Sequence, residues 1–150
     1  MEMMYLDYKN IGRWFGVLDR QSQNYIAKAC IKRNITFQEY ILLLNLYDHE
    51  GINQEDIAAI MLVDKAVVAR NIKLLEEKGL AERVTSDKDR RIKQLFLTAN
   101  GKKEEPFIRS VLENWINYLS EGLEPEKVKI ILEGLKYLSN KALRIEAGKN

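Results

Sequence analysis

The chain has 150 residues, 46% hydrophobic and 31% charged, which is typical of one folded globular domain and argues against disorder. Its formal net charge of +2 does not by itself indicate a nucleic-acid partner. The single cysteine, Cys30, excludes an internal disulfide framework and fits a reducing cytoplasm. The N-terminus lacks the features of a signal peptide, and the longest aliphatic run, 41–44, is far shorter than the roughly 20 residues of a membrane span. We therefore expect a soluble cytoplasmic protein without a membrane partner.

Helical periodicity begins in the first third of the chain. Apolar or small residues recur there in alternating steps of four and three, which predicts a seam along one long helix. The residues of this seam are Ile11, Phe15, Leu18, Ser22, Tyr25 and Ala29. Thr36 and Glu39 then form a capping-box pattern that opens a second helix, and Gly51 can adopt the left-handed conformation that ends it.

Two shorter helices follow, with a brief connection between them. Asn53 is placed to cap a helix that reaches about Met61, and Asp64 is placed to cap another helix, which Gly79 ends. Helices joined by so short a connection must cross steeply. The sequence therefore predicts a helix-turn-helix in the middle of the chain.

Residues 81–98, AERVTSDKDRRIKQLFLT, place a charged centre between two runs that alternate like strands, so a short hairpin is expected. Thr98 is placed to cap a long helix after the hairpin, Gly122 interrupts that helix, and Pro125 suits the first position of a last helix. Apolar residues follow one face of each of these two helices: Phe107, Val111, Trp115 and Tyr118 on the first, and Val128, Ile131, Leu135 and Leu138 on the second.

The apolar seams at both ends of the chain, about 11–29 and 107–138, are longer than a small central domain needs to cover itself. Helices of a second copy would cover them, so a homodimer is favoured. The alternative is that the seams fold back on each other within one chain.

The expected helix from Lys65 to Lys78 has two different faces. Val68, Ile72 and Leu75 follow helical spacing and should face the core. The opposite face combines small residues with cations: Lys65, Ala66, Ala69, Arg70 and Lys73. Such a face suits the DNA major groove, where arginine can donate two hydrogen bonds to guanine. Taken alone, it is more simply a solvated surface.

The hairpin changes that balance. Between Arg83 and Lys93 there are five basic residues and two acidic ones. Arginines at such a tip can reach phosphates or a narrow minor groove, whereas a merely solvated turn is the alternative. Asp89 would repel DNA by itself, and we expect it to pair with a neighbouring arginine and hold that side chain extended. Together, the helix and the hairpin favour DNA as the partner.

These residues resemble the multiple antibiotic resistance regulator (MarR) family of winged helix-turn-helix transcription factors. The resemblance covers roughly residues 35–101 and is carried by "LLEEKGL", "DRR" and "LFLTANG". It implies a mainly α fold with a small β-hairpin wing. The whole chain would be a single domain, with a winged helix-turn-helix DNA-binding region at 34–101 and helical dimerisation regions at 1–33 and 102–150.

The resemblance also implies roles for individual residues. Arg91 matches the arginine of the family's wing tip, Asp89 its supporting acid, and Arg70 the arginine of the recognition helix. The residues expected to contact double-stranded DNA are Gln54, Lys65, Val67, Ala69, Arg70, Lys73, Lys88, Arg90 and Arg91. The implied function is that of a homodimeric regulator, most simply a repressor, that binds a pseudo-palindromic operator.

The sequence departs from the family's pattern at three positions. Val67 and Ala69 stand where the family often has Ser or Thr, which removes hydroxyl donors and leaves methyl groups that can contact thymine. The operator is therefore expected to differ from those of better-known members. Leu62 stands where glycine is common, which suggests a helical rather than a left-handed turn.

The resemblance further implies release from DNA by a small aromatic or anionic effector, bound in a cleft between the dimerisation and DNA-binding regions. The aromatic residues of the helices that would line this cleft are Trp14, Phe15, Tyr25, Tyr40 and Tyr47. Packing within the core and the interface explains these aromatic residues at least as well.

Two other function classes compete. An enzyme is disfavoured, because the only histidine, His49, falls at a helix end and no phosphate loop, metal-ligand cluster or nucleophile–base motif is present, so neither a cofactor nor a metal is expected. Redox sensing by Cys30 is permitted by nearby cations, but simple packing explains a lone cysteine better. The second alternative is a winged helix that binds a protein and has no sequence-specific DNA binding.

Overall fold

The computed structural model describes residues 8–147, which form seven helices and one two-stranded sheet within that range. In chain order the elements are α1 (Tyr8–Cys30), the 3-10 helix η1 (Ile31–Arg33), α2 (Phe37–Asp48), α3 (Gln54–Met61), α4 (Lys65–Glu77), β1 (Ala81–Thr85), β2 (Lys93–Leu97), α5 (Ala99–Leu119) and α6 (Pro125–Ala147). The chain divides into two compact units, with the boundary after Trp115. None of the helices in the described range is long and apolar enough to cross a membrane.

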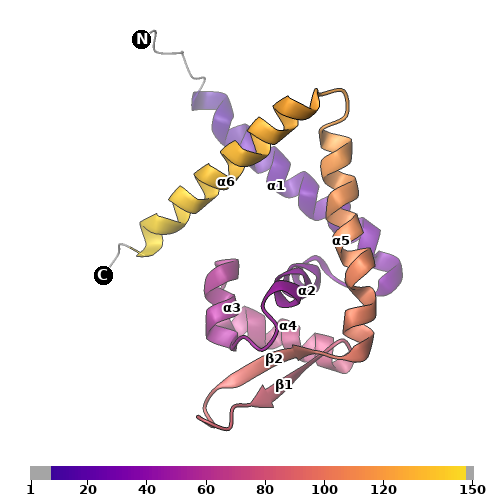
Figure 1. Ribbon diagram of the computed structural model, residues 1–150, viewed down its shortest axis with the longest axis vertical. Coiled ribbons are helices and arrows are strands. Elements are labelled where there is room, and N and C mark those ends of the chain that lie inside the picture. The colour runs from indigo at the N-terminus through magenta and orange to yellow at the C-terminus, as the bar shows by residue number, and fades with distance from the viewer. Residues whose placement is uncertain (1–7, 148–150) are drawn as a thin grey trace. The chain divides into compact units, whose positions relative to one another are not determined.

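The first unit contains a helix-turn-helix with an attached hairpin (Figure 1). Its core is built from fully buried side chains of α2, α3, α4 and β2, among them Leu43, Ile57, Ile72 and Leu95. The capping box predicted for α2 is present, because Thr36 Oγ1 accepts from the Glu39 N–H and Glu39 Oε2 accepts from the Thr36 N–H. The helix-turn-helix with its attached hairpin, among elements that are otherwise all helical, confirms the mainly α winged-helix class predicted from the sequence.

The boundaries of α3 and α4 agree in part with their sequence signals. Asn53 caps α3, with its Oδ1 accepting from the Asp56 N–H at 2.8 Å, as predicted. Asp64 occupies the N-cap position of α4, but its side chain makes no capping hydrogen bond. Its backbone carbonyl accepts from the Val68 N–H at 3.3 Å and so begins the helical ladder.

The expectation of a helical turn at Leu62 was wrong. Leu62 adopts the left-handed conformation, with φ 53° and ψ 44°, at the C-terminus of α3. In this conformation the Val63 N–H can turn back and donate to the Ala58 carbonyl at 3.1 Å, which closes the helix. A Cβ atom in left-handed backbone costs about 1–2 kcal/mol, so here the geometry of the tight turn outweighs the preference of leucine.

The hairpin pairs β1 with β2 in antiparallel register, with Ala81 opposite Leu97 and Thr85 opposite Lys93. α5 starts directly after β2, and Thr98 Oγ1 accepts from the Gly101 N–H at 3.0 Å, which confirms the predicted cap. A Cβ atom at Gly101 would lie 1.9 Å from the Leu80 carbonyl oxygen. The absence of a side chain at Gly101 therefore allows the start of α5 to lie against the end of the α4–β1 connection.

Within the first unit, α1 contacts α5 near its end. Trp115 Nε1 donates to Ser22 Oγ at 2.8 Å, and the Trp115 ring stacks on Tyr25 with centroids 4.8 Å apart. The N-terminal half of α1 and nearly all of α6 nevertheless expose large apolar side chains. Among them are Trp14, Phe15 and Leu18 on α1, and Ile130, Ile131, Leu135 and Leu138 on α6.

Candidate nucleic-acid interface

α4 separates a core face from a polar face, as its sequence pattern predicts. The core face consists of Val68, Ile72 and Leu75, each of which is at most 1% exposed. On the other side, Lys65, Arg70 and Lys73 are exposed. Val67 and Ala69, which the resemblance places against DNA, are half-buried beside these cations. The helix therefore presents a surface of cations separated by short apolar side chains.

The tip of the hairpin, residues 86–92, is held by hydrogen bonds of its own. The Ser86 N–H donates to the Ile92 carbonyl at 2.9 Å, and the Ile92 N–H donates to the Asp89 carbonyl at 3.0 Å. Arg91 donates through Nε and Nη2 to the two carboxylate oxygens of Asp89, at 3.1 and 2.9 Å. These hydrogen bonds lower the pKa of Asp89. The contact expected between Asp89 and a neighbouring arginine is present, and the Arg91 side chain is 90% exposed.

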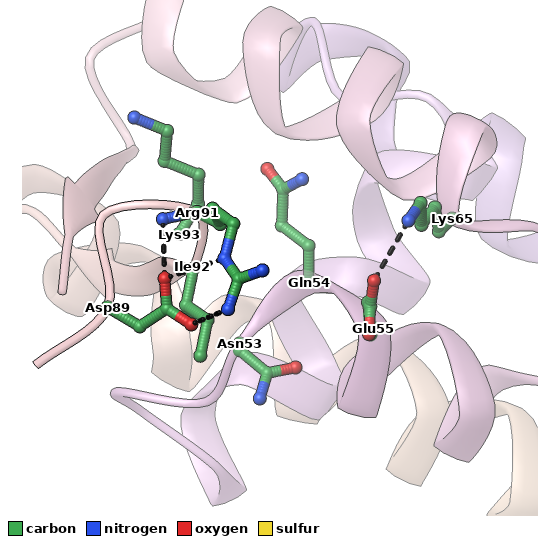
Figure 2. A pocket seen from close by; sticks show the side chains of 8 residues that line it. All are labelled: Asn53, Gln54, Glu55, Lys65, Asp89, Arg91, Ile92 and Lys93. Carbon is green, nitrogen blue, oxygen red and sulfur yellow. Dashed lines mark hydrogen bonds and ion pairs between the residues drawn. The ribbon is translucent and has the colours of Figure 1, made fainter.

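A pocket of about 580 Å³ lies where the starts of α3 and α4 meet the hairpin (Figure 2). Its lining residues are Asn53, Gln54, Glu55, Lys65, Asp89, Arg91, Ile92 and Lys93. Gln54 lies between the Glu55–Lys65 pair on one side and the Asp89–Arg91 pair on the other. Its Oε1 is buried and has no hydrogen-bond partner among the described residues. Three cations and two carboxylates leave the lining with a net positive charge.

The pocket, the outer face of α4 and the hairpin tip are together called the interface below. The cations of the interface fall into two groups. Lys65 Nζ is paired with Glu55 at 2.8 Å and Arg91 with Asp89. In contrast, Arg70, Lys73, Lys88, Arg90 and Lys93 have no carboxylate within ion-pair distance in the described part of the chain. The predicted DNA-contacting residues at 54, 65 and 91 thus share one pocket, whereas Lys88 and Arg90 do not line it.

Sequence reasoning missed the contact that joins the hairpin to α4. Arg83 was counted among the cations of the hairpin, but it donates through Nε and Nη2 to Glu76 at 3.1 and 2.9 Å. Its backbone N–H also donates to Glu76 at 2.9 Å, and these hydrogen bonds lower the pKa of the carboxyl. Arg83 therefore anchors the base of the hairpin. The only signal in the sequence was an acid at the end of one element and a base at the start of the next.

The five aromatic residues proposed for an effector cleft occupy different surroundings. Trp14 and Phe15 are more than half exposed on α1, and Tyr25 stacks on Trp115. Tyr40 is fully buried, and its hydroxyl donates to the Ile108 carbonyl at 2.7 Å. The Tyr47 hydroxyl donates to the Gly101 carbonyl at 2.7 Å. The hydroxyls of Tyr40 and Tyr47 are therefore used in tying α5 to α2.

The two residues considered for other chemistry have structural surroundings. Cys30 is fully buried at the end of α1, and burial raises the pKa of its thiol despite the nearby Arg33. His49 is exposed at the C-terminus of α2, with Nδ1 3.0 Å from the Asn45 carbonyl oxygen. A raised thiol pKa and burial both disfavour the reactive thiolate.

Comparison with known proteins agrees with this geometry. A model of the MarR family matches residues 33–92. The crystal structure of a MarR transcriptional regulator from Methanosarcina mazei is 31% identical, with a TM-score of 0.88, over 91% of this chain and 99% of that one. The chain belongs to the MarR family.

Two other known proteins are similar to this chain. The uncharacterized HTH-type transcriptional regulator YybA of Bacillus subtilis is 33% identical over 98 residues, a stretch that covers 65% of this MarR-family chain and 65% of YybA. The chain thus spans slightly less than two thirds of that relative. A putative MarR family transcriptional regulator from Listeria monocytogenes, solved with a 26mer DNA, has the same fold, with a TM-score of 0.83 and 22% identity over 92% of this chain and 95% of that one.

Proposed function

We propose that this MarR-family protein is a sequence-specific regulator that binds double-stranded DNA through the interface. The observation that carries the proposal is the meeting of α3, α4 and the hairpin around one pocket, with Gln54, Lys65 and Arg91 in its lining. A helix with a cationic outer face fits the major groove, and an exposed arginine beside it fits the adjacent minor groove. The DNA-bound relative from Listeria monocytogenes supports this use of the fold.

The proposed DNA contacts divide by role. Arg70 would donate to a guanine edge, with Val67 and Ala69 against thymine methyl groups. Gln54, Lys65 and Lys73 would contact the phosphate backbone, which positions the helix without reading sequence. Lys88, Arg90 and Arg91 would reach the minor groove and its phosphates, with Asp89 holding Arg91 in place.

The proposed working form is a cytoplasmic homodimer in which the regions 1–33 and 102–150 pair with those of a second copy. Support comes from the large apolar side chains that α1 and α6 each expose to water. A two-fold dimer would bind two half-sites about one helical turn apart, as on a pseudo-palindromic operator. Binding over a promoter would make the protein a repressor. A small aromatic or anionic effector would release it by favouring a dimer geometry that does not match the spacing of the grooves.

The experiment that tests this proposal is selection of bound duplexes from a random pool at moderate salt, followed by sequencing. Enrichment of a pseudo-palindrome is the expected result. If no sequence is enriched and no duplex is retained, the winged helix serves a protein partner instead, and the cations of α4 and the hairpin have another use.

A further inference from the structure

The interface contains two ion pairs that are built differently (Figure 2). Asp89 receives three hydrogen bonds from Arg91, two from the guanidinium and one from the backbone N–H at 3.0 Å. The Asp89 side chain is only 32% exposed, whereas that of Arg91 is 90% exposed. In this pair the carboxylate is therefore the more covered group, and the cation is the group exposed to solvent.

The second pair, Lys65 with Glu55, lacks this difference in exposure. Lys65 Nζ makes one contact of 2.8 Å with Glu55 Oε1, and the two side chains are 67% and 73% exposed. The carboxylate of Glu55 is thus as open to solvent as the ammonium group with which it pairs. An approaching phosphate would meet both groups together, and it would be attracted by Lys65 and repelled by Glu55.

On the basis of the proposed function, we infer that Glu55 is a negative determinant of DNA affinity: it holds the ammonium group of Lys65, for which a DNA phosphate has to compete. Asp89 strengthens binding by fixing Arg91, whereas Glu55 weakens binding by competing for Lys65. Pairs this exposed are weak, so the exchange of partners is easy and its cost is small. Glu55 therefore lowers the affinity for every duplex without preventing binding.

The position of Glu55 has an independent structural reason. It lies in the first turn of α3, where an acidic side chain is stabilised by the positive end of the helix dipole. Removing the charge should leave the stability of the fold unchanged or slightly lower. DNA affinity should then rise without any rise in stability, which a merely structural role for Glu55 would not produce.

The test uses Glu55→Gln, with Glu113→Gln as a matched control that removes the same charge from an exposed position on α5. Affinities are measured by fluorescence anisotropy on the duplex selected by the wild-type protein and on an unrelated duplex. We expect Glu55→Gln to bind both duplexes about two- to fivefold more tightly. Its log–log salt slope should stay close to that of the wild type, because Lys65 contacts the phosphate backbone in both proteins and only the competition by Glu55 is removed. Glu113→Gln should match the wild type.

A second background shows whether Lys65 carries the effect. In Lys65→Met protein, Glu55→Gln should tighten binding clearly less, because no ammonium group remains to be released and only the repulsion between Glu55 and the phosphate is relieved. Binding by Glu55→Gln that is unchanged or weaker, an equal gain in Glu113→Gln, or a gain of undiminished size without Lys65 would each overturn the inference. Failure of the wild-type protein to bind any duplex would overturn the proposed function itself, and the inference with it. Binding by the wild type without a gain in Glu55→Gln would overturn this inference alone.

Discussion

Arg91 and Arg70 have different roles in the proposed interface, because only one of them is fixed by the protein. The Arg91 guanidinium is held by two hydrogen bonds to Asp89, so its direction is set before DNA arrives. Arg70 is exposed on α4 and, within the described part of the chain, has no ion-pair partner. Arg91 is therefore oriented before it enters a groove, whereas Arg70 can adjust to the base edge that it contacts.

Replacing Arg91 with alanine should weaken binding to the selected duplex by about tenfold or more, since the hairpin loses its most exposed paired cation. The thermal unfolding temperature should stay that of the wild type, because the Arg91 side chain is 90% exposed. Fluorescence anisotropy and a melting curve measure the two quantities. Lys103→Ala, which removes a cation from an exposed site on α5, is the control. An unchanged affinity would remove the hairpin from the mechanism.

Replacing Arg70 with alanine should relax the base preference of one position in each half-site and cost about 1–3 kcal/mol on the selected duplex, as expected for a bidentate base contact. Binding to unrelated duplexes should change much less. Repeating the duplex selection with the variant shows this directly. An equal loss on all sequences would instead make Arg70 a phosphate contact.

Among the elements, the contact between α4 and β1 decides how the hairpin is placed. Glu76 accepts three hydrogen bonds from Arg83, and both side chains are about 30% exposed. Since β1 leads directly to the hairpin tip, this contact connects the position of Arg91 to that of α4. The hairpin is therefore attached to α4 by side chains as well as by the short connection between α4 and β1.

Glu76→Gln should lower the free energy of unfolding by about 1 kcal/mol at neutral pH, a value reduced by the partial exposure of the pair. Arg83 depresses the pKa of Glu76 below its ordinary value of 4.5 in the folded state. The stability from this contact is therefore present above pH 4.5 and lost as the pH falls through the lower, folded-state pKa.

Urea unfolding at neutral and acidic pH measures the Glu76 effect, with Glu77→Gln as an exposed control at the end of the same helix. The difference between wild type and Glu76→Gln should shrink on acidification, while Glu77→Gln follows the wild type throughout. A difference that stays constant down to the lowest pH would show that the charge of Glu76 is not its source.

The sequence predicted most elements because their ends carry local signals. Thr36 with Glu39, Asn53 and Thr98 form caps within four residues of chain, and the structure contains all three. The conformation of Leu62 was mispredicted because the tight turn that ends α3 requires left-handed backbone there, and this requirement outweighs the preference of leucine. The pairing of Glu55 with Lys65 could not be read from the sequence, since it depends on how two helices cross.

At the scale of the whole molecule, the exposed apolar side chains of α1 and α6 predict self-association. Trp14, Phe15 and Leu135 are between 43% and 55% exposed, which is costly for side chains of this size. Sedimentation velocity at micromolar concentration should give a single dimeric species. A monomer under these conditions would contradict the dimer and the pseudo-palindromic operator derived from it.

The measurement that tests the central claim most directly is the affinity for the selected duplex, titrated across salt concentrations, with an unrelated duplex in parallel. Because the interface carries several lysines and arginines, log affinity should fall linearly and steeply with log salt on both duplexes. At every salt concentration the selected duplex should bind about a thousandfold or more tighter than the unrelated one. Equal affinity for both duplexes, or binding that ignores salt, would contradict the assignment of this surface to sequence-specific DNA recognition.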